Sequence, residues 1–219
     1  MGLAGLVSVL CVVATLVGCT STSSSGGDEF TPKSEEQIAA EWAAEFEAAR
    51  AAATSDFERE VLADDKITPA EYDEAVQRYI ACMKETLPPE FADGYQAVKT
   101  QFGTYQYQGP RIHESQNEAW EAAYAAAHDA CRTGTTAQIE PIYTEMILNP
   151  KRMTPEEQML DCLKRHGVVD ETYTMDNFRA DQVANFGEGS VLGDYDPNQA
   201  TGLDLETEEA TRCLVMPWT

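Results

Sequence analysis

Two stretches of this chain repeat one pattern: Ile67-Thr68-Pro69-Ala70-Glu71 leads to Cys82-Met83-Lys84, and Met153-Thr154-Pro155-Glu156-Glu157 leads to Cys162-Leu163-Lys164. In each stretch the threonine is placed to cap a helix, and the proline takes the first helical position, where its missing N–H costs nothing. A glutamate three residues after the threonine completes a capping box. Each cysteine then falls on the body of its helix. The repeat predicts two helical units built around equivalent capped helices.

The rest of the chain also has mainly helical periodicity, with capping signals at Ser34, Ser55 and Ser115. Between Glu90 and Glu114 aromatic residues interleave with glycines, which predicts a small hairpin or an aromatic loop. The expected helices cover about residues 34–53, 55–62, 68–87, 115–131, 139–148, 154–167, 174–186 and the stretch that ends at Cys213. The fold class predicted is therefore mostly α.

The first residues have the pattern of a targeting signal. Leu16-Val17-Gly18-Cys19 closes an uncharged apolar run that begins at Met1. The length of this run and the small residue before Cys19 are typical of a secretory leader. An uncleaved transmembrane anchor is the alternative, but a spanning helix needs about 20 apolar residues, and this run includes Gly, Ser and Thr.

Leu16–Cys19 resembles a bacterial lipobox, and the chain resembles the uncharacterised lipid-anchored exported proteins of high-GC Gram-positive bacteria. No Lys or Arg precedes Lys33, which departs from the basic start of such leaders. The resemblance implies a signal peptide over 1–18, a diacylglyceryl group on Cys19, and an extracytoplasmic body held to the cell membrane by this lipid anchor. Residues 19–33 would form a Ser/Gly-rich linker, and 34–219 a helical domain with units over about 55–150 and 151–219.

Four cysteines would remain in the mature body: Cys82, Cys131, Cys162 and Cys213. An even number in an exported chain implies disulfides, and four cysteines allow three connectivities. The repeat selects one of them, because the later cysteines lie 49 and 51 positions after the earlier ones and each ends an acidic helical stretch. We predict Cys82–Cys131 and Cys162–Cys213, which would pin the two helical units separately.

Composition and motifs exclude several functions. With 38 acidic and 15 basic residues the net charge is −23, so nucleic acid is disfavoured as a partner. The sequence has no H-E-x-x-H, no G-x-S-x-G and no phosphate-binding glycine loop. Asp194-Tyr195-Asp196-Pro197-Asn198 opens like a calcium loop, but Gln199 and Leu205 stand where that loop needs glycine and glutamate. We assign no catalytic residue, metal or cofactor.

Two hypotheses follow for function. The favoured one is a non-enzymatic, membrane-tethered module that binds an unknown protein or small ligand. The alternative is a tethered hydrolase that acts on the cell envelope. A cleft that holds His113 or His128 against a carboxylate of raised pKa would favour the hydrolase, and an exposed aromatic patch from 91–107 would favour binding.

Overall fold

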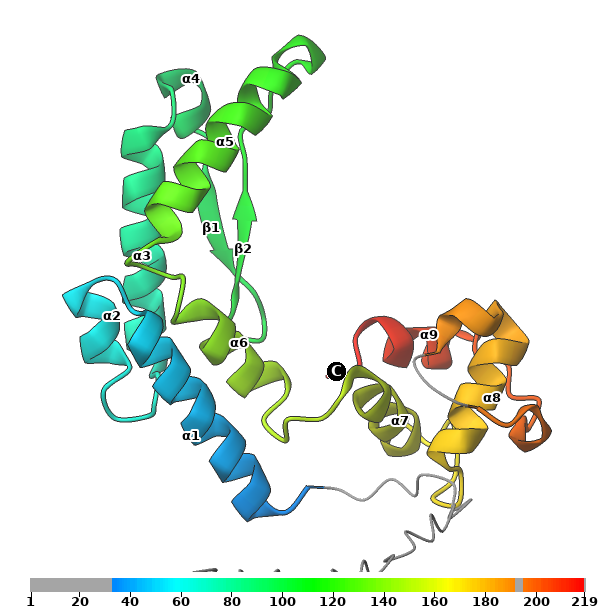
Figure 1. Ribbon diagram of the computed structural model, residues 1–219. Coiled ribbons are helices and arrows are strands. Elements are labelled where there is room, and N and C mark those ends of the chain that lie inside the picture. Colours follow the sequence, from blue (N-terminus) through cyan, green and yellow to red (C-terminus); the bar gives the residue numbers. More distant parts are fainter. Residues whose placement is uncertain (1–32, 192–194, 219) are drawn as a thin grey trace, which may run out of the picture.

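The computed structural model describes residues 33–191 and 195–218, and it is mostly α-helical in two units (Figure 1). The expected leader and Cys19 lie outside the described residues, as does Asp194. None of the helices in the described ranges is both long enough and apolar enough to cross a membrane.

The first unit contains six α-helices and one hairpin. Three of its helices begin at predicted capping residues: Ser34, Ser55 and Thr68 each form a capping box. The bounds are α1 Glu35–Ala52, α2 Asp56–Val61, α3 Pro69–Thr86, α4 Pro89–Ala92, β1 Gln96–Lys99, β2 Tyr105–Gln108, the 3-10 helix η1 Glu114–Gln116, α5 Asn117–Arg132 and α6 Glu140–Leu148.

Helix α3 is the centre of this unit. Its apolar side chains at three- and four-residue spacing are buried, and they divide between two hydrophobic clusters. One cluster holds α3 against α1, α2 and α6, and the other holds it against α4 and α5. The disulfide Cys82–Cys131 joins α3 to α5, as predicted.

The hairpin is antiparallel, with Val98 opposite Gln106 and Ala97 opposite Tyr107. Tyr105 and Tyr107 lie on its inner face, against the core, whereas Gln106 and Gln108 are exposed on the outer face. On the inner face, the Tyr107 hydroxyl donates to Oε1 of Glu140 at 2.8 Å, and this bond attaches the hairpin to α6.

The second unit is smaller. It comprises α7 Pro155–Arg165, α8 Met175–Phe186, the 3-10 helices η2 Glu188–Ser190 and η3 Pro197–Gln199, and α9 Glu208–Val215. Thr154 forms the predicted capping box, and the disulfide Cys162–Cys213 joins α7 to α9. Leu160, Leu163, Phe178 and Leu205 are fully buried around this bond.

Most of the predicted fold is confirmed, including the mostly α class, the hairpin and both disulfides. One local prediction was wrong. Ser115 does not cap α5: His113 caps the preceding turn η1, and α5 starts at Asn117 without a side-chain cap. Helix α3 ends before Pro88-Pro89, and Pro89 starts the additional short helix α4, because proline is favoured in a first helical turn.

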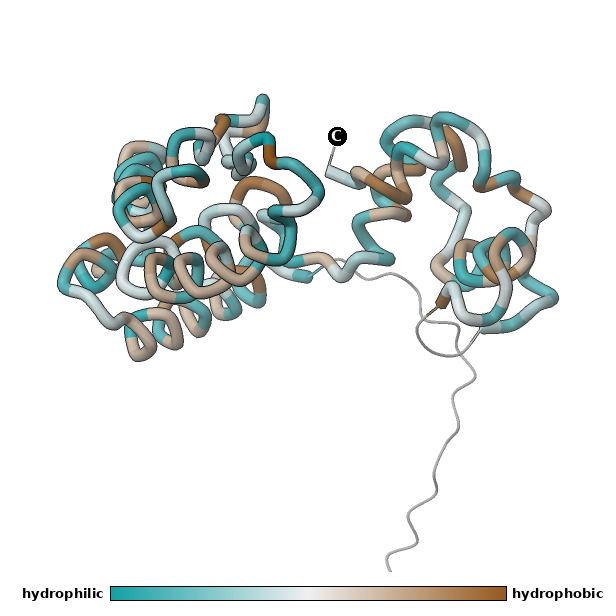
Figure 2. The backbone as a smooth tube through the Cα atoms, turned by 90° about the horizontal axis from the view of Figure 1, so that it is seen from above, coloured by the Kyte–Doolittle hydropathy of each residue, from teal (hydrophilic) through white to brown (hydrophobic). Residues whose placement is uncertain are grey.

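The two units lie side by side, joined by the segment that follows α6 (Figures 1 and 2). Figure 2 shows the C-terminal end of the described chain between them. The end of α9 therefore returns toward the hairpin and α6.

Candidate functional site

The most distinctive surface of the molecule is an open cleft where the two units meet. It consists of two hollows of about 360 and 300 Å³ that share Leu148 and Trp218. Four large apolar side chains in and beside it remain substantially exposed: Val98 at 40%, Ile147 at 44%, Met216 at 41% and Trp218 at 39%. Exposed apolar side chains that gather in one concave place mark a binding surface.

The larger hollow has the outer face of the hairpin as its floor. Lys99 is the one charged residue among those that line it. The full lining is Val98, Lys99, Thr100, Gln101, Phe102, Thr104, Gln106, Leu148, Met216 and Trp218. The hydroxyls of Thr100 and Thr104 are 2.9 Å apart and close the hairpin turn. Because side chains alternate along a strand, Val98 and Gln106 project to the same outer face as the paired amides of Gln96 and Gln108.

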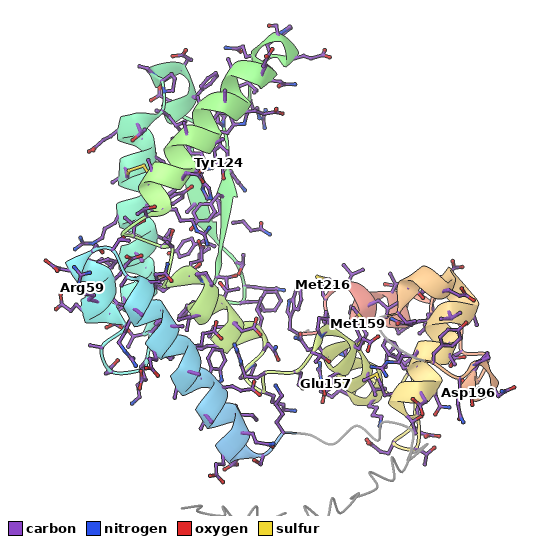
Figure 3. The ribbon with its side chains drawn as sticks, viewed as in Figure 1. Arg59, Tyr124, Glu157, Met159, Asp196 and Met216 are labelled. Atoms are coloured by element: carbon purple, nitrogen blue, oxygen red, sulfur yellow. A yellow bond between two sulfur atoms is a disulfide. The ribbon has the colours of Figure 1, made fainter. Side chains whose placement is uncertain are left out.

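The opposite wall comes from the chain beyond α9. Arg165 of α7 donates to the carbonyl oxygen of Pro217 at 2.7 Å, and the backbone N–H of Met216 donates to that of Arg212 at 2.8 Å. Pro217 is buried by this arrangement. Met216, labelled in Figure 3, lies on the side of the second unit that faces the first. The C-terminal residues are thus held in place by α7.

The segment between the units is tightly bonded. The buried Asn149 side chain accepts from the N–H of Met153 at 2.8 Å and donates to the carbonyl of Met153 at 2.8 Å and to Glu145 Oε1 at 2.6 Å. Arg152 adopts a left-handed backbone with φ of 54°, and its guanidinium lies 4.4 Å from the centre of the Trp42 ring. This segment is therefore anchored both to α6 and to α1 of the first unit.

The smaller hollow is more polar, but its charges are already paired. Lys151 and Arg165 both face Asp161, at 3.6 and 2.7 Å. In the larger hollow, the Lys99 ammonium lies 2.6 Å from Asp73. The full lining of the smaller hollow is Ile147, Leu148, Asn149, Pro150, Lys151, Met153, Gln158, Asp161, Arg165, Pro217 and Trp218.

A separate hollow of about 420 Å³ lies within the second unit, between residues 168–177 and 201–203. At its edge the buried Asp181 carboxylate accepts from the Tyr173 hydroxyl and from Thr201 and Gly202. Burial raises the pKa of Tyr173, and the hydrogen bond to Asp181 adds to the rise. This network holds the 201–203 loop on α8, so we assign Asp181 and its hydrogen bonds a structural role.

The histidines considered in the hydrolase hypothesis do not reach the cleft. The His113 Nδ1 lies 2.9 Å from the Ser115 hydroxyl in the η1 cap. The Nδ1 of His128 lies 2.8 Å from the Tyr79 hydroxyl, and its ring stacks on Tyr124.

Asp196 of the predicted calcium-like loop and His166 both lie at helix caps. Asp196 caps η3, where its Oδ1 accepts from the N–H of Asn198 at 2.9 Å. His166 caps α7 at its C-terminus, and it lies with Cys162 and Cys213 in a group whose possible ligand atoms are within 4.8 Å of one another. Both sulfurs of that group are joined in the disulfide, so the group is not a set of thiolate ligands.

Comparison with known protein families, with curated proteins and with solved structures finds no match to this chain. The site is therefore interpreted from its own geometry.

Sequence reasoning did not identify the cleft, although one signal was present. From Gly94 to Pro110 the only charged residue is Lys99, in a chain of which 24% is charged. Such a charge-poor run is unusual for an exposed hairpin. Trp218, which lines the same hollow as the hairpin, lies more than a hundred positions away in sequence. No sequence pattern links it to the hairpin.

Proposed function

We propose that this protein is a lipid-anchored extracytoplasmic module that binds its ligand in the cleft between the two units. The observation that carries the binding function is the open cleft, in which Trp218, Met216 and Val98 stay exposed at the junction of elements held in fixed positions. Two disulfides support an oxidising compartment, where such bonds persist.

The proposed tether is the diacylglyceryl group on Cys19. Two acyl chains give stable membrane attachment, since each buried CH₂ contributes about 0.8 kcal/mol. Residues 20–33 would then hold the body clear of the bilayer, and the acidic surface would keep it away from anionic lipid.

The exposed aromatic patch that would favour binding is not found over 91–107 in the described chain, because Phe91 and Tyr95 are buried and Tyr107 packs against the core. The cleft therefore carries the binding function, which the placement of the histidines favours over hydrolysis.

A cleft that held His113 or His128 against a carboxylate of raised pKa would have favoured hydrolysis. Instead, Nδ1 of His113 lies beside the Ser115 hydroxyl, and Nδ1 of His128 lies beside the Tyr79 hydroxyl. The lining of the cleft offers amides, threonine hydroxyls and apolar groups, which position a ligand without activating a nucleophile.

Membrane fractionation tests the tether, with a matched pair of cysteine variants. Cys19→Ser is expected to release the protein from the membrane fraction, whereas Cys11→Ser, in the same apolar run, is expected to leave it attached. Retention of the Cys19→Ser protein in the membrane, or equal release of both variants, would overturn the proposal.

A further inference from the structure

The hydrogen-bonding groups of the cleft differ from those beside it on the same hairpin face. Outside the hollow, the Gln96 amide donates to Gln108 at 3.1 Å, so these two side chains satisfy each other. Inside it, the side-chain amides of Gln101 and Gln106 have no hydrogen-bond partner among the described residues. An amide offers two donors and an acceptor, so these groups are available to a ligand.

Charge does not select the ligand here. The cationic groups that line the cleft already face carboxylates, with Lys99 on Asp73, and Lys151 and Arg165 on Asp161. An acidic peptide would have to compete with these intramolecular pairs. The floor also holds uncharged polar side chains where the tail of a fatty amphiphile would need apolar ones.

What remains is a ligand that is uncharged, rich in hydroxyls and apolar on one face. A pyranose ring has these properties: its hydroxyls lie around the rim, and its C–H groups form an apolar face that packs on an aromatic ring. Trp218 supplies such a ring at 39% exposure, and it lines the same hollow as Gln106. The two adjoining hollows, which share Trp218, could each hold one of the successive sugar units of a linear oligosaccharide.

We propose that the cleft binds a linear oligosaccharide, with one sugar ring stacked on Trp218 and its hydroxyls bonded to the amides of Gln106 and Gln101. This inference rests on the proposed binding function and names its ligand class. Linear glycans are abundant outside the cytoplasmic membrane, where the tether would hold this domain.

Isothermal titration of the full chain purified from its native host, with linear tetramers of N-acetylglucosamine, glucose and mannose, tests the proposal. At least one tetramer is expected to bind. Trp218→Phe should keep affinity within about threefold, whereas Trp218→Leu and Gln106→Ala should each lose about tenfold, because they remove the ring face and the amide. Gln96→Ala, on the same hairpin face outside the hollow, is the matched control and should bind like the parent.

Three results would overturn the proposal. They are no heat change with any tetramer, equal binding by Trp218→Leu and Trp218→Phe, or equal losses in Gln106→Ala and Gln96→Ala. Thermal melting of each variant shows that it is folded.

Titration with laurate and with an acidic apolar peptide separates the proposed binding function from the proposed sugar ligand. If either probe binds in a Trp218-dependent way while no tetramer does, the cleft is a binding site but not for sugar. The membrane attachment through Cys19 is measured independently of all of these.

Discussion

At the scale of single residues, the described core is unusual for its buried hydroxyl groups. Tyr72 and Tyr107 both donate to Oε1 of Glu140, at 2.9 and 2.8 Å. Burial raises the pKa of both phenols, and the nearby Glu140 carboxylate adds to the rise. The phenols therefore stay protonated and donate to the carboxylate across the physiological pH range.

Removal of one of these hydroxyls is expected to weaken the first unit. Tyr107→Phe should lower the free energy of unfolding by about 1.5–3 kcal/mol, since it deletes a hydrogen bond to a charged acceptor. Tyr72→Phe should do the same, and the double variant should differ from the sum because both share Glu140. Urea denaturation of the four proteins measures this. Additive losses would show that the two bonds are not coupled.

A second residue-scale prediction concerns pH. The Lys99 ammonium and the Tyr105 hydroxyl hold the pKa of Asp73 below its usual range, with the Lys99 hydrogen bond the largest cause. Because the folded pKa is depressed, the contribution is present above the unfolded value of about 3.9 and is lost as pH falls through the folded pKa.

Asp73→Asn should therefore be less stable than the parent at pH 6, by less than about 1 kcal/mol since the pair is partly exposed. The difference should shrink toward pH 3. Urea midpoints at the two pH values check it, and a difference that grows on acidification would contradict the assignment.

At the scale of elements, capping and disulfides define the two units. The capping boxes at Thr68 and Thr154 could be predicted because threonine and glutamate lie three residues apart in sequence. The disulfide pairing followed from the repeat for a similar reason. The start of α5 could not be predicted, because His113 caps the separate turn η1 ahead of it and α5 then begins at Asn117 without a side-chain cap.

Removal of each disulfide should act on its own unit. Each bond spans about fifty residues, so replacing both cysteines with alanine should cost about 4 kcal/mol in the chain-entropy model. Hydrogen exchange should then increase in α3 and α5 for the Cys82/Cys131 variant, and in α7 and α9 for the Cys162/Cys213 variant. Faster exchange in the opposite unit would show that the units unfold together.

At the scale of the whole molecule, the cleft depends on how the two units are oriented. Its lining joins residues of β1, β2 and α6 to those beyond α9, which are far apart in sequence and share no periodicity. Bonds of Asn149 and Arg152 hold the connecting segment on the first unit, and we expect these tertiary contacts to set the orientation. For this reason the sequence predicted the helices and disulfides but not the cleft.

Asn149→Ala tests this role of the connecting segment. It removes hydrogen bonds to Glu145 and Met153 from a buried position, so the free energy of unfolding should fall by about 2 kcal/mol. Small-angle X-ray scattering should show a broader distribution of distances between the units. Asn198→Ala, in an exposed turn of the second unit, is the control and should change neither quantity. An unchanged scattering profile for Asn149→Ala would mean that other contacts fix the orientation.

The central claim is that a lipid at Cys19 tethers an oxidised body of two helical units outside the cytoplasm. Intact mass spectrometry of the protein purified from membranes tests it most directly, with and without thiol alkylation. We predict a chain that begins at Cys19, carries a diacylglyceryl group and has no alkylatable thiol among Cys82, Cys131, Cys162 and Cys213. A chain that retains residues 1–18 without lipid and takes up alkylating reagent at all four of these positions would contradict the claim.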